Sequence, residues 1–116
     1  MSYDIGLYRK GLKNKSKNWY YPYYGNITYN VCKMLEVAFG ENHLKKWNDK
    51  SADKFIEDLK KGYYDMLEKP SKYKQYNSPN GWGTYEHTLE SIDELYKTII
   101  EYSENDGLEN IYLDFQ

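Results

Sequence analysis

Two segments of the sequence combine short polar side chains, glycines and aromatic rings in a pattern that suits ligand binding. Residues 25–30 read Gly-Asn-Ile-Thr-Tyr-Asn, and residues 77–85 read Asn-Ser-Pro-Asn-Gly-Trp-Gly-Thr-Tyr. Each leads into a predicted helix, where unpaired backbone N–H groups attract anions such as phosphate. Aromatic rings can stack on a nucleobase, which contributes about 1–3 kcal/mol for each base. We therefore predict one pocket for a nucleotide-type ligand, built from both segments.

Side-chain chemistry suggests a role for each residue of this predicted pocket. Amides and a hydroxyl would supply polar contacts, rings would stack, glycines would let the backbone bend, and two cations would meet phosphate. The polar contacts would come from Asn26, Thr28, Asn30 and Asn80, and the stacking rings from Tyr29, Trp82 and Tyr85. The glycines are Gly81 and Gly83, and the cations are Arg9 and Lys10. Simpler interpretations stay open, because Asn26 or Thr28 can act as an ordinary helix cap and Trp82 can plug a core beneath a turn.

Tyrosine is unusually abundant, at 15 of 116 residues, and it is concentrated after a run of lysines. Tyrosine offers a large flat area, a hydrogen-bonding tip and only two side-chain torsions, which suits protein interfaces. We therefore predict a partner-binding surface over residues 13–24; the alternative is a solvated loop whose rings cover a small core. The residues of this surface are Lys13, Lys15, Lys17, Trp19, Tyr20, Tyr21, Tyr23 and Tyr24.

The common catalytic motifs are absent from the sequence, which contains no GxSxG, P-loop or GxGxxG pattern. Cys32 is the only cysteine, so an internal disulfide and a multi-cysteine metal site are excluded. We predict no enzymatic activity, no cofactor and no metal site. A hydrolase using His87 and Glu86 is the enzymatic alternative, and His43, in a polar connector, is assigned no role.

Periodicity indicates the elements that would position these residues. Residues 3–8 and 111–115 alternate between apolar and polar, which is typical of strands. Helical spacing of apolar residues predicts one helix over residues 28–39, a second from Ser51 to Pro70, and a third from residue 83 or 84 to about Gly107. Residues 70–83 are expected to form a loop. Gly62, inside the second helix, is expected to cost about 1 kcal/mol relative to alanine.

The order strand, three helices, strand predicts an α+β fold in which the N- and C-terminal strands share one small sheet and three helices pack against it. Two strands alone are marginal in water. We therefore expect either a further strand from residues 9–27 or a sheet continued across a homodimer. The length predicts a single domain over residues 1–116, with residues 9–25 as a Lys- and Tyr-rich loop or insertion.

The net charge of -2 is unevenly distributed, with a balance of +5 over residues 1–50 and -8 over residues 77–116. Such asymmetry either steers a charged partner or pairs one half of the chain with the other. A pI near 5.7 and a single arginine argue against binding of duplex nucleic acid. With neither an apolar run of about 18 residues nor a signal-peptide pattern, we predict a cytoplasmic protein without a membrane partner.

Three blocks of the sequence resemble an uncharacterised family of small phage and prophage proteins. They are residues 2–5, Ser-Tyr-Asp-Ile; residues 26–30, which match Asn-x-Thr-x-Asn; and residues 80–86, which match Asn-Gly-Trp-Gly-x-Tyr-Glu. The blocks occur in the same order over most of the chain, whereas the Lys- and Tyr-rich segment at residues 9–24 departs from the family pattern. The resemblance implies a phage gene product that acts inside a bacterial cell.

This resemblance narrows the expected functions to two, because small non-enzymatic phage proteins often counter host defence. The first hypothesis is a counter-defence protein that sequesters a nucleotide-type immune signal. The second is an anti-CRISPR-like inhibitor that docks on a host defence nuclease or effector. The expected partner is accordingly a nucleotide-like small molecule or a host defence protein, and the chain itself is a candidate homodimer or higher homo-oligomer.

Overall fold

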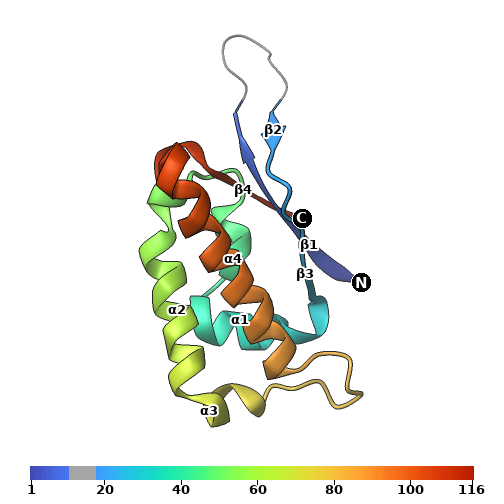
Figure 1. Ribbon diagram of the computed structural model, residues 1–116. Helices are drawn as coiled ribbons and strands as arrows, with labels where there is room; N and C mark the ends of the chain where they lie inside the picture. The colour runs from blue at the N-terminus through green and yellow to red at the C-terminus, as the bar shows by residue number, and fades with distance from the viewer. Residues whose placement is uncertain (11–17) are drawn as a thin grey trace.

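The computed structural model describes residues 1–10 and 18–116, with a small sheet on one side and helices on the other (Figure 1). The predicted α+β class is confirmed, and both terminal strands belong to one antiparallel sheet. The strands are β1 (Ser2–Arg9), β2 (Trp19–Tyr20), β3 (Gly25–Thr28) and β4 (Tyr112–Phe115). The helices are α1 (Cys32–Phe39), α2 (Ile56–Glu68), α3 (Pro70–Lys74) and α4 (Tyr85–Asp106).

β1 is the central strand of this sheet. Tyr8 pairs with residues of both β2 and β4, and Ile5 pairs with residues of both β3 and β4. A residue has one neighbour on each edge of its strand, so β2 and β3 must share the edge opposite β4. The expected further strand from residues 9–27 is thus present, in two pieces.

A bulge separates those two pieces. Tyr8 pairs with Tyr20 and Ile5 with Gly25, so β1 advances by three residues while its neighbour advances by five. The ladder continues to Tyr21, whose backbone N–H donates to the Leu7 carbonyl oxygen over 2.9 Å. The two extra residues are therefore accommodated between Tyr21 and Gly25, where Pro22 has no N–H to contribute to a ladder.

The core lies between the sheet and the helices. Alternate residues of β1, Tyr3, Ile5 and Leu7, are buried, as their spacing in the sequence predicts. The predicted apolar stripe of the second helix is buried as well; its members are Ala52, Phe55, Ile56, Leu59, Tyr63 and Met66. One cluster of buried residues joins the strands and helices.

Three boundaries differ from the sequence-based expectation. The second helix does not begin at Ser51, because Ala52–Lys54 form a 3-10 turn and α2 begins at Ile56. Residues 70–83 do not form a loop throughout, because Pro70 is the first residue of α3, a position that needs no backbone N–H donor. The helix expected over residues 28–39 begins as a 3-10 turn, Tyr29–Val31, and continues as α1. Thr28 caps that turn, since its Oγ1 accepts a hydrogen bond from the Asn30 N–H over 3.3 Å.

The outer edge of β4 is covered by the segment before α2. Backbone hydrogen bonds join Leu113 to Asp49 and Lys50, over 2.7 and 3.1 Å, and Ala52 to Ile111 over 2.7 Å. This cover removes one unpaired strand edge, the feature through which sheets tend to associate.

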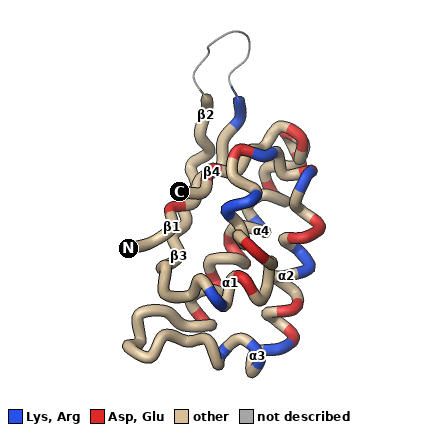
Figure 2. Tube along the Cα trace, turned by 180° about the vertical axis from the view of Figure 1, so that it is seen from behind, with Lys and Arg blue, Asp and Glu red and all other residues tan. Residues whose placement is uncertain are grey.

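Two ion pairs tie the acidic C-terminal part to the rest of the chain, one of them to the basic first half. Arg9 lies 3.5 Å from Asp106, and Lys74 lies 3.3 Å from Glu86. Figure 2 shows residues of both signs interleaved along α2. Within residues 1–10 and 18–116, no helix combines the length and apolar character needed to cross a membrane.

Candidate functional site

The two segments predicted to bind a ligand lie against each other. The side-chain amide of Asn30 donates a hydrogen bond to the Trp82 carbonyl oxygen over 3.1 Å. A Cβ atom at Gly83 would lie only 2.9 Å from a Val31 methyl carbon and 3.1 Å from a Thr28 methyl carbon. The absence of a side chain at Gly83 therefore lets the two segments pack closely, as the hypothesis of a shared pocket requires.

Many polar groups of this junction are already paired with neighbours. The backbone N–H of Tyr85 donates to Asn77 over 2.7 Å, that of His87 to Thr84 over 3.2 Å, and that of Trp82 to Asn80 over 2.9 Å. These side chains occupy N–H groups at the start of α4 that an anion would otherwise bind.

The aromatic residues of the junction differ in exposure. The Tyr85 side chain is only 5% exposed, and its hydroxyl donates to the Met66 carbonyl oxygen over 2.6 Å. Trp82, in contrast, is 74% exposed, and Tyr29 is 40% exposed. Gly81, with φ near +76°, adopts a conformation that glycine tolerates best. The junction is thus a packed structural contact with an indole projecting from it.

The structure separates Arg9 and Lys10 from this junction, which corrects the predicted phosphate contacts. Ser2 pairs with Thr28 at one end of β1, and Arg9 pairs with Trp19 at the other. Seven residues along a strand span about 24 Å, too far for one nucleotide to contact both ends. Lys10 instead lies over the Tyr112 ring, with Nζ 4.7 Å from its centroid.

A second candidate site covers the face of the sheet that turns away from the helices. Tyr8 pairs directly with Tyr20 and with Tyr112, so that three rings form a row across the strands. Their ring centroids are 5.3 and 5.5 Å apart. Three carboxylates accompany the tyrosines of this face. We call this set the tyrosine face: Asp4, Tyr8, Tyr20, Tyr24, Asp49, Tyr112 and Asp114.

Hydrogen bonds to carboxylates fix several rings of the tyrosine face. The hydroxyl of Tyr8 donates to Asp49 over 2.7 Å. That of Tyr24 donates to Asp4 over 2.8 Å, and Asp4 also accepts from Asn26 over 3.0 Å. Burial, and then the hydrogen bond to Asp49, raises the pKa of Tyr8 well above its usual value. The hydroxyl groups therefore stay protonated and keep donating at neutral pH.

The Tyr20 ring crosses β1 beside Gly6, where an added Cβ atom would make only an ordinary van der Waals contact, 3.7 Å from the ring. The Tyr20 hydroxyl reaches Asp114 on β4, over 3.1 Å. The sequence-based site contained neither Tyr8 nor Asp114. The alternation of the terminal strands, which assigns Asp4 and Tyr8 to one face, is the signal that could have identified this surface.

The predicted partner-binding run is divided between two faces of the sheet. Tyr20 and Tyr24 are 53% and 68% exposed and belong to the tyrosine face. Trp19 pairs with Arg9, so it lies on the opposite face, 55% exposed and edge-on to Tyr21. Tyr23 is half-buried, packed against the core. The three predicted lysines of this run lie outside the described residues; they are Lys13, Lys15 and Lys17.

Tyr21 belongs to the core rather than to a binding surface. It is 5% exposed and stacks on Tyr102 with ring centroids 4.2 Å apart, while its hydroxyl donates to Asp106 over 2.6 Å. The expectation that every ring of the aromatic run contacts a partner is therefore wrong for this residue. Its ring closes the core beside α4, because odd and even positions of a strand face opposite ways.

His43, which the sequence left without a role, is buried. It is 1% exposed and lies edge-on to the rings of Tyr3 and Phe115. Its Nδ1 accepts a hydrogen bond from the Leu44 N–H over 2.8 Å, and its Nε2 has no partner among the described residues. Burial, followed by the nearby charges of Lys45 and Lys46, lowers the pKa of His43 to about 4.

Acid is expected to destabilise the protein through His43. Between pH 6.5 and 4 the unfolded imidazole takes up a proton and the folded one does not, so the free energy of unfolding falls as the pH falls. In His43→Leu this part of the pH dependence should disappear, as measured by urea unfolding at several pH values. His87→Gln, at an exposed histidine, should keep the wild-type profile. An unchanged profile in His43→Leu would contradict the assignment.

No metal centre is indicated in the part of the chain that the structure describes, where no three His, Cys, Asp or Glu residues are placed to hold an ion. No protein-family model matches this chain, and the comparisons with curated proteins and with solved structures found no match. The resemblance to small phage and prophage proteins therefore stays a prediction from the three sequence blocks.

Proposed function

We propose that this chain is a non-enzymatic binding protein that docks on a protein through the tyrosine face, as an inhibitor of a host defence nuclease or effector. The observation that carries the proposal is the outer face of the sheet, on which the exposed rings of Tyr20 and Tyr24 are held by hydrogen bonds to carboxylates, while Tyr8 is buried beneath them. The helices pack against the other face (Figure 1).

The rings of this face have the properties of interface anchors. Tyr20 and Tyr24 are both more than half exposed, although large aromatic side chains are usually well covered. Their hydroxyl groups are tied to Asp114 and Asp4, so little side-chain freedom remains to be lost on binding. Tyrosine is among the residues that most often dominate the binding energy of protein interfaces.

Charge favours a basic partner. The tyrosine face carries three carboxylates, Asp4, Asp49 and Asp114, and Lys10 lies at its end over Tyr112. Lys46, Lys50 and Lys54 line a pocket with Asp49 and Tyr112, so the acidic part of the face is the part around Asp4 and Asp114. Nuclease surfaces that hold nucleic acid are rich in Lys and Arg, so a carboxylate-bearing face complements them. Docking of this kind should weaken as salt concentration rises.

Sequestration of a nucleotide-type signal at residues 26–30 and 80–85 is less well supported. Backbone N–H groups there are bonded to Thr28, Asn77, Asn80 and Thr84. A phosphate would have to displace those side chains, whereas the tyrosine face can bind a partner without breaking internal hydrogen bonds.

The proposal predicts loss of docking when the exposed rings are removed. With the protein as bait in bacterial lysate, the wild type should retain a stoichiometric protein partner, and retention should fall with salt. Tyr20→Ala/Tyr24→Ala should lower the affinity for that partner by at least tenfold, since anchors of this kind contribute more than about 1.4 kcal/mol.

Tyr64→Ala is the matched control, because Tyr64 is an exposed tyrosine on α2, away from the tyrosine face. It should bind like the wild type. Thermal unfolding of each variant establishes that it is folded. Equal retention by the double variant and the wild type would refute docking through this face, and a partner lacking a basic surface would refute the charge argument.

A further inference from the structure

A pocket of about 550 Å³ opens beside the end of the sheet. Its volume lies within the range of about 300–1,000 Å³ that is common for small-molecule sites. The sheet, the turn before α1, α1 itself and the segment after His43 all contribute to its lining. The lining residues are Tyr3, Tyr29, Cys32, Lys45, Asn48, Phe115 and Gln116.

Three aromatic rings form the apolar part of this pocket. Tyr3 lies 4.4 Å from Tyr29 and 5.0 Å from Phe115, measured between ring centroids. Tyr3 and Phe115 are each 5% exposed and fixed in the core, whereas Tyr29 is 40% exposed. A planar ligand could therefore stack against Tyr29 while the other two rings keep their places.

Among the described residues that line the pocket, Lys45 alone has a charged side chain. Its Nζ lies 5.3 Å from the centroid of the Tyr3 ring. None of the ion pairs formed between described residues involves Lys45. Asn48 and Gln116 also line the pocket, but their side-chain amides are already bonded, to Asp49 over 3.4 Å and to Asp114 over 2.8 Å, so the ligand contacts rest on Tyr29 and Lys45. A cation beside aromatic walls suits a ligand that is both planar and anionic.

We propose that this pocket binds a planar aromatic anion of the nucleoside monophosphate class, with the base stacked on Tyr29 and the phosphate paired with Lys45. Its rings differ from those of the tyrosine face, because Tyr3 and Phe115 lie on the helix-facing side of the sheet. The two sites adjoin at Asn48 and Gln116, which bond to Asp49 and Asp114. The pocket also differs from the site expected at residues 80–85, since of the sequence-predicted residues only Tyr29 contributes to its lining.

The single cysteine provides a direct reporter of occupancy. Cys32 lines the pocket and is partly exposed. A bound ligand should shield its thiol, so that alkylation by iodoacetamide slows as ligand is added. Because the chain has no other cysteine, the rate of modification measured by mass spectrometry reports on this position alone.

The test titrates the full chain with AMP, adenosine and ribose 5-phosphate, by calorimetry and by Cys32 alkylation. AMP should bind and protect Cys32 at about 1 mM. Adenosine, which lacks the charge, and ribose 5-phosphate, which lacks the base, should each bind about tenfold more weakly. No heat and no protection by AMP would overturn the proposal.

Variants distinguish the two contacts. Lys45→Gln should weaken AMP about tenfold and leave adenosine unchanged, whereas Tyr29→Ala should weaken both. Lys33→Gln is the matched control, an exposed lysine of α1 that does not line the pocket, and it should bind AMP like the wild type. If Lys45→Gln and Tyr29→Ala both bind AMP normally, the pocket is not the site. The two proposals can fail separately. If AMP binds but the lysate yields no protein partner, only docking through the tyrosine face fails; if a protein partner binds but AMP does not, only the pocket proposal fails.

Discussion

Replacing Gly62 with alanine is expected to destabilise the protein by about 1–2 kcal/mol, although alanine is the better helix former by about 1 kcal/mol. Gly62 faces α1, where an added Cβ atom would overlap the Phe39 ring and lie 2.9 Å from the Ala38 carbonyl oxygen. The ring is 6% exposed and packs against Trp47, and the carbonyl belongs to the backbone, so neither can move freely. Overpacking of this kind costs about 1–3 kcal/mol or more, which outweighs the gain in helix propensity.

Urea unfolding of Gly62→Ala measures this effect. Lys61→Ala, at the exposed neighbouring position, is the control and should change the free energy of unfolding by less than about 0.5 kcal/mol. Phe39→Leu combined with Gly62→Ala should be less destabilised than the sum of the two single variants, because the smaller side chain relieves the overlap. A higher midpoint for Gly62→Ala would show that helix propensity dominates and that α1 and α2 can separate.

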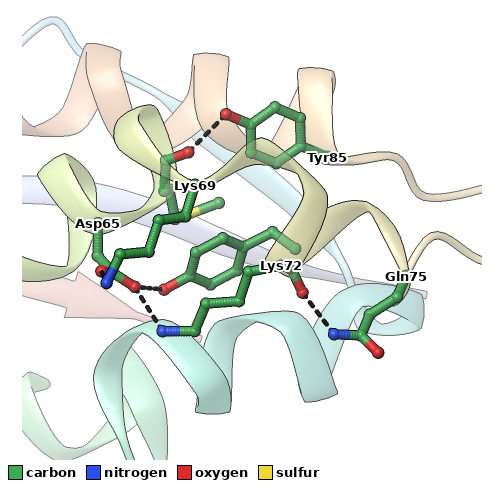
Figure 3. A network of polar contacts seen from close by, with 7 residues as sticks. Asp65, Lys69, Lys72, Gln75 and Tyr85 are labelled. Carbon is green, nitrogen blue, oxygen red and sulfur yellow. Dashed lines mark hydrogen bonds and ion pairs between the residues drawn. The ribbon is translucent and has the colours of Figure 1, made fainter.

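Replacing Asp65 with alanine is expected to cost about 2–3 kcal/mol. Asp65 on α2 accepts hydrogen bonds from Lys72, over 2.7 Å, and from the Tyr73 hydroxyl, and it lies 2.9 Å from Lys69 (Figure 3). Exposed ion pairs contribute little, but the Tyr73 side chain is fully buried. In Asp65→Ala the Tyr73 hydroxyl would remain buried without its carboxylate partner, which accounts for most of the expected loss of stability.

Two further variants separate these contributions. Tyr73→Phe removes the hydroxyl and leaves Asp65 with both lysines, so it should cost only about 1 kcal/mol. Asp58→Ala, at an exposed acid of the same helix, should have little effect. Equal stability of Asp65→Ala and Asp58→Ala would contradict the prediction. It would mean that the hydrogen bond between Asp65 and Tyr73 does not hold α3 against α2.

The same carboxylate should make stability depend on pH in the acid range. Hydrogen bonds from Lys72, Tyr73 and Lys69 hold the pKa of Asp65 well below its usual range. The unfolded carboxyl takes up a proton near pH 4 and the folded one does not, so this stabilisation is complete above about pH 5 and is lost as the pH falls below 4. Asp65→Asn should lose this slope, while the effect of His43 at higher pH should remain.

Local periodicity explains how much of the fold the sequence predicts. The alternation in β1 and β4 and the apolar stripes of α2 and α4 arise from the geometry of single elements, so the α+β class follows without knowledge of any contact. The need for a further strand also follows from the sequence, because two strands cannot form a stable sheet alone. The sequence did not predict that α3 begins at Pro70, because proline can end one helix and begin another equally well.

Tertiary contacts decided the candidate sites. Asn30 and Trp82 meet as the sequence predicts, but only the fold determines that the neighbouring N–H groups are already bonded. The tyrosine face depends on strand register, which brings Asp114 to Tyr20 from the other end of the chain.

Composition and periodicity alone determined the α+β fold class, the small sheet and the excess of aromatic rings, because these depend on residue type and local spacing. Tertiary structure alone decided which rings are exposed, that His43 is buried, and that Gly62 supports the packing of α1 and α2 instead of weakening a helix. Burial and close approach are properties of pairs of elements, and pairs distant in the chain leave no periodic trace in the sequence.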